Sequence, residues 1–150
     1  MEESIRIVDI YEYMPVLREL LGEGKEVSLT ITGNSMAPFL VHGRDVVVIA
    51  NPDGNWKKGD IALFQRKTSQ YILHRICRVD KNGNCFFIGD GQQIVEGPIA
   101  PEQIFGKIVA ARRKGKWEKP GTFWWEFFRH IWLYIVPLRP ICHRVYRLLR

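Results

Sequence analysis

The stretch TITGNSMAPFLVHGRDVVVI frames one small hydroxyl, that of Ser35. Gly33 and Asn34 before it tolerate tight or positive-φ backbone, and Pro38 after it blocks continued strand pairing. Met36 can bury and fix the backbone next to the hydroxyl. Such a frame can aim neighbouring N–H groups at one point, as a nucleophile with an oxyanion site requires. A plain turn in a β-protein is the alternative interpretation of the same residues.

A serine needs a base that takes its proton before it can act as a nucleophile. Among the four histidines, His74 lies in QYILHRICRV, a run with apolar residues on both sides. A histidine there is either a satisfied core residue or a positioned base. Asp90 follows a buried run in FFIGDGQ, where a carboxylate can reach back and orient an imidazole, or can simply cap a turn.

Short strand signals surround these residues, with little helix between them. Alternating or β-branched runs predict six strands, in VSLTIT, DVVVIA, DIALFQR, QYILHRICRV, CFFIG and FGKIVAARR. Turn residues in HGRD, NPDGNWKKGD, DKNGN and EGPIAPEQ separate them, and DKNGN predicts a two-residue hairpin loop with Cys85 opposite Asp80. MPVLRELLGEG predicts a short N-terminal helix. The fold class is therefore mainly β: a small coiled antiparallel β-domain with a short N-terminal helix and an amphipathic helical C-terminal tail.

The 150 residues suit one β-domain over residues 1–116, with its core at 27–112, followed by a basic aromatic tail over residues 117–150. Basic residues number 11 against 14 acidic ones up to Gly106, and 11 against 2 from Lys107 onward, so the basicity belongs to the tail. The first 18 residues are acidic and mixed, and we expect synthesis without a cleavable signal. Three cysteines without metal-ligand spacing predict reduced thiols, no metal and no cofactor.

The tail, TFWWEFFRHIWLYIVPLRPICHRVYRLLR, is rich in aromatic and basic residues. It is too short and too charged for an easy membrane span, because about 20 apolar residues are usual. A basic helix with bulky aromatic residues on its other face suits a membrane interface, whereas packing on the β-domain or on a partner protein is the alternative. We expect peripheral membrane association through residues 122–150, on the cytoplasmic side, and no nucleic-acid binding.

The boxes GNSMAPFLVHGRDVVVI, KKGDIALF, ILHRI, FFIGDGQ and FGKIV resemble, in order and spacing, those of the S24/S26 peptidase superfamily. The superfamily joins signal peptidases with self-cleaving proteins of the phage-repressor and SOS-response type. The resemblance implies that Ser35 is the nucleophile and that His74, in a His-Arg box, is the base, as in archaeal and endoplasmic-reticulum signal peptidases. Asp90 matches the aspartate of the Gly-Asp box, Glu96 is a possible auxiliary acid, and Asp60 belongs to a structural box.

The resemblance implies a serine endopeptidase that cleaves a leader- or signal-type segment of a precursor polypeptide after a small residue. Two departures qualify it. Gly33 stands where signal peptidases commonly carry a hydroxyl residue, so the oxyanion would depend on backbone N–H groups such as that of Ser35, and the N-terminal membrane helix of signal peptidases is missing. They favour an alternative, a catalytically inactive peptide-binding homologue. A repressor-type regulatory protein is a third possibility, against which stand the histidine base and the lack of a helix-turn-helix segment.

Overall fold

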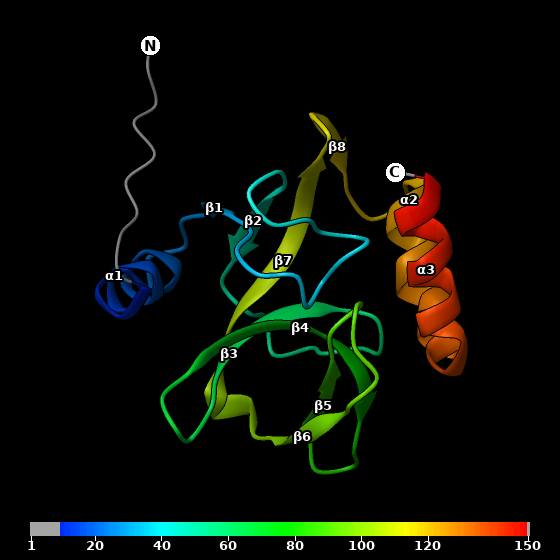
Figure 1. The fold of residues 1–150 in the computed structure, drawn as a ribbon. Helices are drawn as coiled ribbons and strands as arrows, with labels where there is room; N and C mark the ends of the chain where they lie inside the picture. The colour runs from blue at the N-terminus through cyan, green and yellow to red at the C-terminus, as the bar shows by residue number, and fades with distance from the viewer. Residues whose placement is uncertain (1–9, 150) are drawn as a thin grey trace.

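The computed structural model describes residues 10–149, and within them eight strands form one antiparallel sheet (Figure 1). The strand order is β1-β2-β7-β3-β4-β5-β6, with β8 paired to β7. The predicted mainly β fold with an N-terminal helix and C-terminal helices is confirmed. The strand bounds are β1 Val27–Thr30, β2 Val46–Ala50, β3 Ile61–Gln65, β4 Tyr71–Val79, β5 Cys85–Ile88, β6 Glu96–Ile99, β7 Ile104–Arg113 and β8 Lys116–Glu118.

The long strand β7 joins the two parts of the sheet. It pairs with β2 along one edge and with β3 along the other, and both pairings contain a register shift. Such shifts bend a strand and increase its twist. The sheet therefore coils, so that β3 to β6 wrap around a second apolar cluster while β1, β2 and the upper part of β7 lie apart from them (Figure 1).

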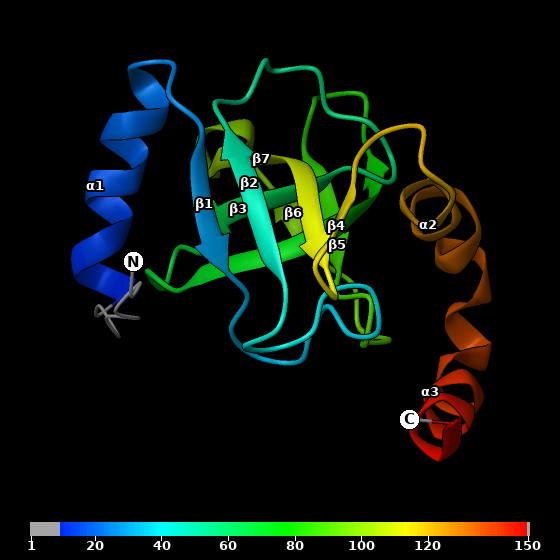
Figure 2. The same cartoon turned by 90° about the horizontal axis from the view of Figure 1, so that it is seen from above.

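The N-terminal helix α1, Ile10–Gly22, covers the β1 edge of the sheet (Figure 2). Met14, Leu17 and Leu21 share one helical face and are almost fully buried in the main core. Gly24, at a φ of 81°, follows the last turn, where the Lys25 N–H donates to the Leu20 carbonyl. The predicted helix is thus present and begins a few residues earlier than its sequence signal.

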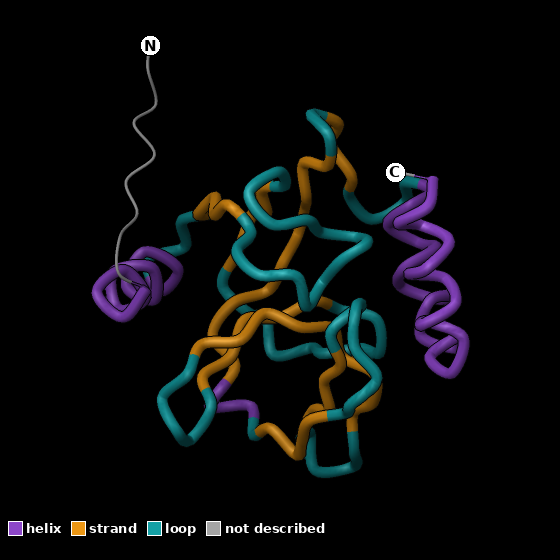
Figure 3. The backbone as a smooth tube through the Cα atoms, viewed as in Figure 1, coloured by secondary structure: helices purple, strands orange, loops and turns teal. Residues whose placement is uncertain are grey.

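The tail is helical and runs along the opposite side of the sheet (Figure 3). Its inner aromatic side chains Trp125, Phe128 and Trp132 are buried in the same core cluster as Phe39 and Met14. Among residues 10–149, no helix is both long and apolar enough to cross a bilayer. The predicted boundary at residue 116 stays a prediction. The tail consists of α2 Phe123–Glu126, a π-helical turn Phe127–Ile131, a 3-10 segment Trp132–Leu138 and α3 Arg139–Leu149.

Two short strands escaped the sequence prediction. EGPIAPEQ was predicted to be a turn, yet Glu96–Ile99 forms β6, and Lys116–Glu118, within the predicted linker, forms β8. Pro98 is tolerated in β6 because β6 is the last strand of the sheet, and the backbone N–H groups along its outer edge need no partner strand. Strands this short, with glycine, proline and charge in them, lack the apolar alternation on which strand prediction depends.

The predicted register of the DKNGN hairpin was wrong. Cys85 lies opposite Val79, not Asp80, and Asp80 N–H donates to the Asn84 carbonyl at 2.9 Å. The loop therefore comprises residues 81–83, with Gly83 at a φ of 83°. This is the three-residue hairpin loop, in which the glycine supplies the left-handed position, rather than the two-residue Asn-Gly turn.

Candidate active site

An open cleft of about 1050 Å³ lies beside the Ser35 loop. His74 of β4 lines it, and so do Asn34 and Ala37, the residues on either side of the Ser35–Met36 pair. Ser35 itself is partly exposed. The remaining walls come from the segment after β5 and from the tail, with Arg66, Gly91, Gln92, Gln93, Ile94, Glu96, Arg139, Pro140 and Arg147.

The Ser35 loop is closed at its base by Asp45. Ile31 N–H donates to the Asp45 carbonyl at 2.9 Å, and the buried Asp45 carboxylate accepts hydrogen bonds from Val41 N–H, Lys114 N–H and the Arg44 side chain. Burial by itself would raise the pKa of Asp45, but these hydrogen bonds outweigh it and lower the pKa. The carboxylate therefore stays ionised at neutral pH and holds Val41 at one end of the loop, while the Asp45 backbone carbonyl holds Ile31 at the other.

The glycines of the Gly-Asp-Gly segment let two backbones approach closely. Gly91 N–H donates to the Ser35 carbonyl at 2.9 Å. A Cβ on Gly89 would lie 2.5 Å from that carbonyl oxygen, and one on Gly91 would lie 2.9 Å from the Ala37 carbonyl oxygen. Real Cβ atoms essentially never come this close to an oxygen. Only glycine at positions 89 and 91 therefore lets this loop approach the Ser35 backbone.

The N–H groups of Ser35 and Met36 are the candidate donors of an oxyanion site. Within residues 10–149, the N–H groups of Ser35 and Met36 donate to no protein acceptor. The Gly33 N–H is instead engaged, since it donates to His42 Nδ1 at 2.8 Å, and the Asn34 carbonyl accepts from Ala37 N–H. Paired free N–H groups beside a nucleophile are what an oxyanion site needs. Of the predicted site loop, Ser35 and Met36 thus offer donors.

His74 is 5% exposed, and its Nδ1 is buried without a hydrogen-bond partner. That leaves Nε2 as the ring nitrogen that can face the cleft. Burial lowers the pKa of His74 to about 4, partly opposed by the negative charge of Glu96. The imidazole is therefore neutral at pH 7, the form that a general base requires. No hydrogen bond joins it to the Ser35 hydroxyl in the described part of the chain.

Asp90 accepts no hydrogen bond from His74 in the described part of the chain, contrary to the predicted orienting role. Its two carboxylate oxygens accept hydrogen bonds from Arg75 Nε and Nη2, both at 2.8 Å, and both side chains are almost completely buried. Arg75 also donates to the Gly59 carbonyl at 2.9 Å. Successive side chains of a strand point to opposite faces, so Arg75 and His74 lie on opposite faces of β4. Asp90 pairs with the side chain on the Arg75 face. Asp90 thus fastens the Gly-Asp-Gly loop to β4.

Glu96 is the acid whose charge acts most strongly on His74. It lines the cleft, and its carboxylate forms a bidentate pair with Arg66 at 2.6 and 2.7 Å. That bond raises the pKa of Arg66. Asp60, assigned to the fold, accepts from Lys57 N–H and pairs with Arg129 at 3.4 Å. The auxiliary role of Glu96 stays a prediction.

Sequence reasoning missed two tail residues that support the site. Trp132 Nε1 donates to the Asp90 carbonyl at 2.7 Å. Arg139, which is 1% exposed, donates to the Gly89 carbonyl at 2.9 Å and to the Gln92 carbonyl at 2.8 Å. The tail therefore fixes the Gly-Asp-Gly loop, and this loop in turn binds the Ser35 carbonyl through the Gly91 N–H. A lone arginine within the apolar run LYIVPLRPIC was the available signal, because a buried arginine needs acceptors.

The structure describes all three cysteines. Cys77, Cys85 and Cys142 are free thiols, and burial raises the pKa of Cys85 to about 11. In the part of the chain that the structure describes, no group of three or more histidine, cysteine or acidic side chains could hold a metal ion.

We expect His74 to remain neutral down to about pH 4 in the folded protein. Since an exposed histidine titrates near 6.5, the unfolded chain binds this proton first as the pH falls. Folding stability should therefore decrease between pH 6.5 and 4, by about 3 kcal/mol in total for this group. NMR titration of the ring, assigned with His74→Gln, measures the pKa, and urea unfolding at pH 7 and 5 measures the stability. A ring that titrates near 6.5 would contradict the burial.

The comparison with protein families shows the family of the chain. A model of the peptidase S24-like family matches residues 2–109, which is more than half of the chain. The matched range holds Ser35, His74 and Asp90 and ends within β7, before the tail. A comparison with curated proteins found no similar relative. The chain belongs to the peptidase S24-like family.

Proposed function

We propose that the protein is a serine endopeptidase of the signal-peptidase type, with Ser35 as its nucleophile and His74 as its base. The observation that carries the proposal is the shared cleft, which His74 and the two neighbours of the Ser35–Met36 pair all line. The free N–H groups of Ser35 and Met36 supply the second requirement, two donors for a developing oxyanion.

The reaction follows from these groups. Ser35 Oγ attacks the scissile carbonyl carbon while His74 Nε2 takes the hydroxyl proton, and the N–H groups of Ser35 and Met36 bind the oxyanion. His74 then gives the proton to the leaving amine, which leaves an ester on Ser35. Water, deprotonated by His74, hydrolyses that ester and frees the enzyme. Asp90 acts through its pair with Arg75, which fixes the Gly-Asp-Gly loop, and Gly91 of that loop binds the Ser35 carbonyl.

The proposed substrate is an extended leader- or signal-type segment of a precursor polypeptide. The cleft is open, and residues 91–94 line one side of it, with Ile94 81% exposed. An exposed apolar side chain beside an open cleft suits an apolar substrate side chain, since their contact removes both from water. Three arginines and one glutamate line the same cleft, which favours substrates without clustered positive charge.

A fluorophosphonate probe tests this assignment, because it phosphonylates an activated serine and releases fluoride. We expect one labelled peptide, containing Ser35, and essentially no labelling of Ser35→Ala. Ser28→Ala, which removes an exposed serine of β1, should label like the parent protein. Equal labelling of the parent and Ser35→Ala would refute Ser35 as nucleophile.

The second candidate function is peptide binding without turnover. The observation that favours it is the absence of a hydrogen bond between the Ser35 hydroxyl and His74 in the described chain. Such bonds often tighten only when substrate is present. A folded parent protein that resists fluorophosphonate yet retains intact precursor peptides would establish this function instead.

A further inference from the structure

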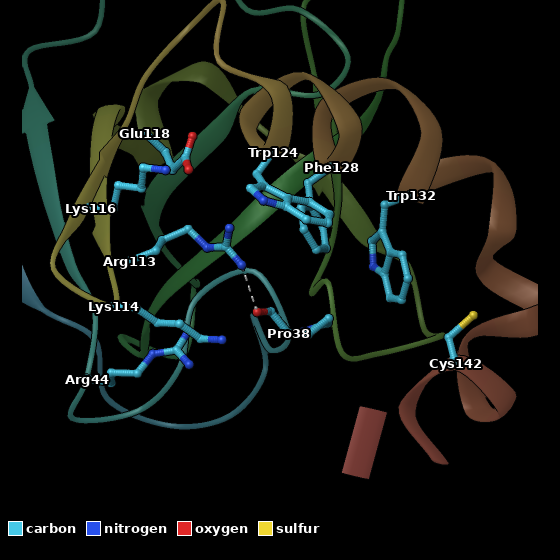
Figure 4. Close-up of a pocket in the computed structure, with 10 residues that line it drawn as sticks. All are labelled: Pro38, Arg44, Arg113, Lys114, Lys116, Glu118, Trp124, Phe128, Trp132 and Cys142. Atoms are coloured by element: carbon cyan, nitrogen blue, oxygen red, sulfur yellow. Dashed lines mark hydrogen bonds between the residues drawn. The ribbon is translucent and has the colours of Figure 1, made fainter. Parts of the chain in front are cut away.

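A second cavity, of about 440 Å³, lies between the β7–β8 hairpin and the tail (Figure 4). Among the residues that the structure describes, none lines both this cavity and the candidate active-site cleft. The proposed reaction uses none of its side chains, although Trp132 supports the Gly-Asp-Gly loop. It touches the Ser35 loop at Pro38, whose carbonyl accepts a hydrogen bond from Arg113.

One wall of this cavity is cationic. Arg44, Arg113, Lys114 and Lys116 contribute to it, against a single lining carboxylate, that of Glu118. Arg44 is neutralised by Asp45, at 2.8 Å, and Arg113 donates to the Phe39 carbonyl. Lys114 and Lys116 are exposed, so the wall keeps an excess of positive charge that is accessible from solvent. A wall of this kind attracts an anion.

The opposite wall is aromatic. Trp124, Phe128 and Trp132 come from the tail, and Figure 4 shows their rings facing the basic side chains across the cavity. The ring centroids of Phe128 and Trp132 are 5.4 Å apart, and the Arg113 guanidinium lies 5.6 Å from the Phe128 centroid. A cationic wall opposite an apolar wall matches a ligand that carries a negative charge next to hydrocarbon.

The aromatic wall continues into exposed apolar surface. Trp124 lines the cavity and is also 47% exposed. The ring of Phe123, which is 71% exposed, lies 5.0 Å from that of Trp124, and elsewhere in the tail Tyr134 is 72% and Leu149 83% exposed. A small soluble anion in the cavity would leave these apolar side chains in water. Aromatic and basic side chains mixed in this way are typical of segments at the boundary between lipid headgroups and acyl chains.

We propose that this cavity binds the phosphate of an anionic phospholipid in a bilayer. Lys114, Lys116 and Arg113 contact the phosphate, and Trp124 with its exposed neighbours lies among the first carbons of the acyl chains. Charge complementarity and the exposed aromatic side chains of Phe123 and Trp124 beside the cavity carry the proposal, which is independent of the peptidase assignment. The cavity reaches Pro38 of the Ser35 loop, so bound lipid would lie close to the candidate active site.

The test is flotation of the full chain with vesicles of phosphatidylcholine that contain or lack 30% phosphatidylglycerol. We expect partition onto the anionic vesicles with a blue shift of tryptophan emission, and little partition onto neutral ones. Lys114→Ala/Lys116→Ala should weaken partition by roughly 25-fold, because each basic residue near an anionic surface contributes about five-fold. The matched control Lys67→Ala/Lys81→Ala removes the same charge from the β3–β4 and β4–β5 turns and should stay within about two-fold.

Three results would overturn the proposal. Equal partition onto neutral and anionic vesicles would show that the net negative charge of the headgroup is not recognised, since phosphatidylcholine also carries a phosphate. Equal losses in the two double variants would show that total charge, not this cavity, drives binding. Soluble glycerol phosphate or polyglutamate that binds through Lys114 and Lys116, without any vesicle binding, would assign the cavity to a free anion or an acidic polypeptide.

Discussion

Replacing His74 with glutamine should slow fluorophosphonate labelling of Ser35 by at least roughly 10³-fold, because general-base removal of the serine proton contributes up to about 10⁴-fold in such sites. Glutamine has a similar size and polarity but takes up no proton near neutral pH. For the parent protein, the labelling rate should be constant from pH 8 to about pH 5, since burial places the pKa of His74 at about 4. Below that pKa the rate should fall tenfold for each pH unit.

The matched control is His130→Gln, which changes an exposed histidine of the tail paired with Glu126 at 2.9 Å. Its labelling rate should equal that of the parent protein. Thermal unfolding of both variants separates loss of the base from loss of the fold. A folded His74→Gln protein that labels at the parental rate, with the same pH profile, would remove His74 from the mechanism.

Breaking the buried ion pair between Arg75 and Asp90 should have the largest effect on stability. Removing one partner leaves an uncompensated buried charge, which costs about 3–5 kcal/mol. We therefore expect Arg75→Met to lower the free energy of unfolding by that amount, and Tm by roughly 10 °C for a chain of this size. The Gly-Asp-Gly loop should loosen at the same time, because Arg75 is the side chain that holds its carboxylate.

The double variant Arg75→Met/Asp90→Leu provides the decisive comparison. It removes both charges, so denaturant unfolding should show that most of the stability lost in Arg75→Met has returned. Glu23→Gln, in an exposed pair with Lys25, should change stability by less than about 1 kcal/mol. If the double variant is no more stable than the single one, loop packing rather than charge would explain the effect.

The local parts of this architecture could be predicted from the sequence. The strands with long β-branched or alternating runs were found, and so was the helix with Leu17 and Leu21 on one face. These features depend on neighbouring residues or on short patterns, and such patterns carry most of the information in a single sequence. The proximity of His74 to the Ser35 loop is long-range, and only the resemblance to the S24/S26 superfamily implied it; the structure has His74 in the same cleft as the residues that flank Ser35–Met36.

The partner of Asp90 could not be predicted in the same way. Asp90 follows β5, beside the part of β4 that holds both His74 and Arg75, and the sequence does not specify which of the two it contacts. Asp90 pairs with Arg75 because a buried guanidinium needs two or more acceptors, and a carboxylate provides two in matching geometry. Without a carboxylate partner, neutral His74 lacks a single hydrogen bond at Nδ1, and that bond would be weaker than the charged pair of Arg75 and Asp90.

The surroundings of the tail could not be predicted either, for a physical reason. Its aromatic residues indicated an apolar surface, but periodicity does not distinguish a face that meets lipid from one that packs on the protein's own sheet. In the structure, some of these aromatic side chains pack on the protein and others are exposed. Trp125 and Phe128 are buried in the core, while Phe123 and Tyr134 remain exposed.

The hydrogen bonds from Trp132 and Arg139 to the Gly89–Gln92 carbonyls also set an order of events during translation. A growing polypeptide that has left the ribosome up to β7 already contains its serine and its histidine, but not the side chains that restrain the segment between them. Completion of the candidate active-site cleft therefore requires residues 132–139. We expect the proposed peptidase activity to begin only after synthesis has passed that point.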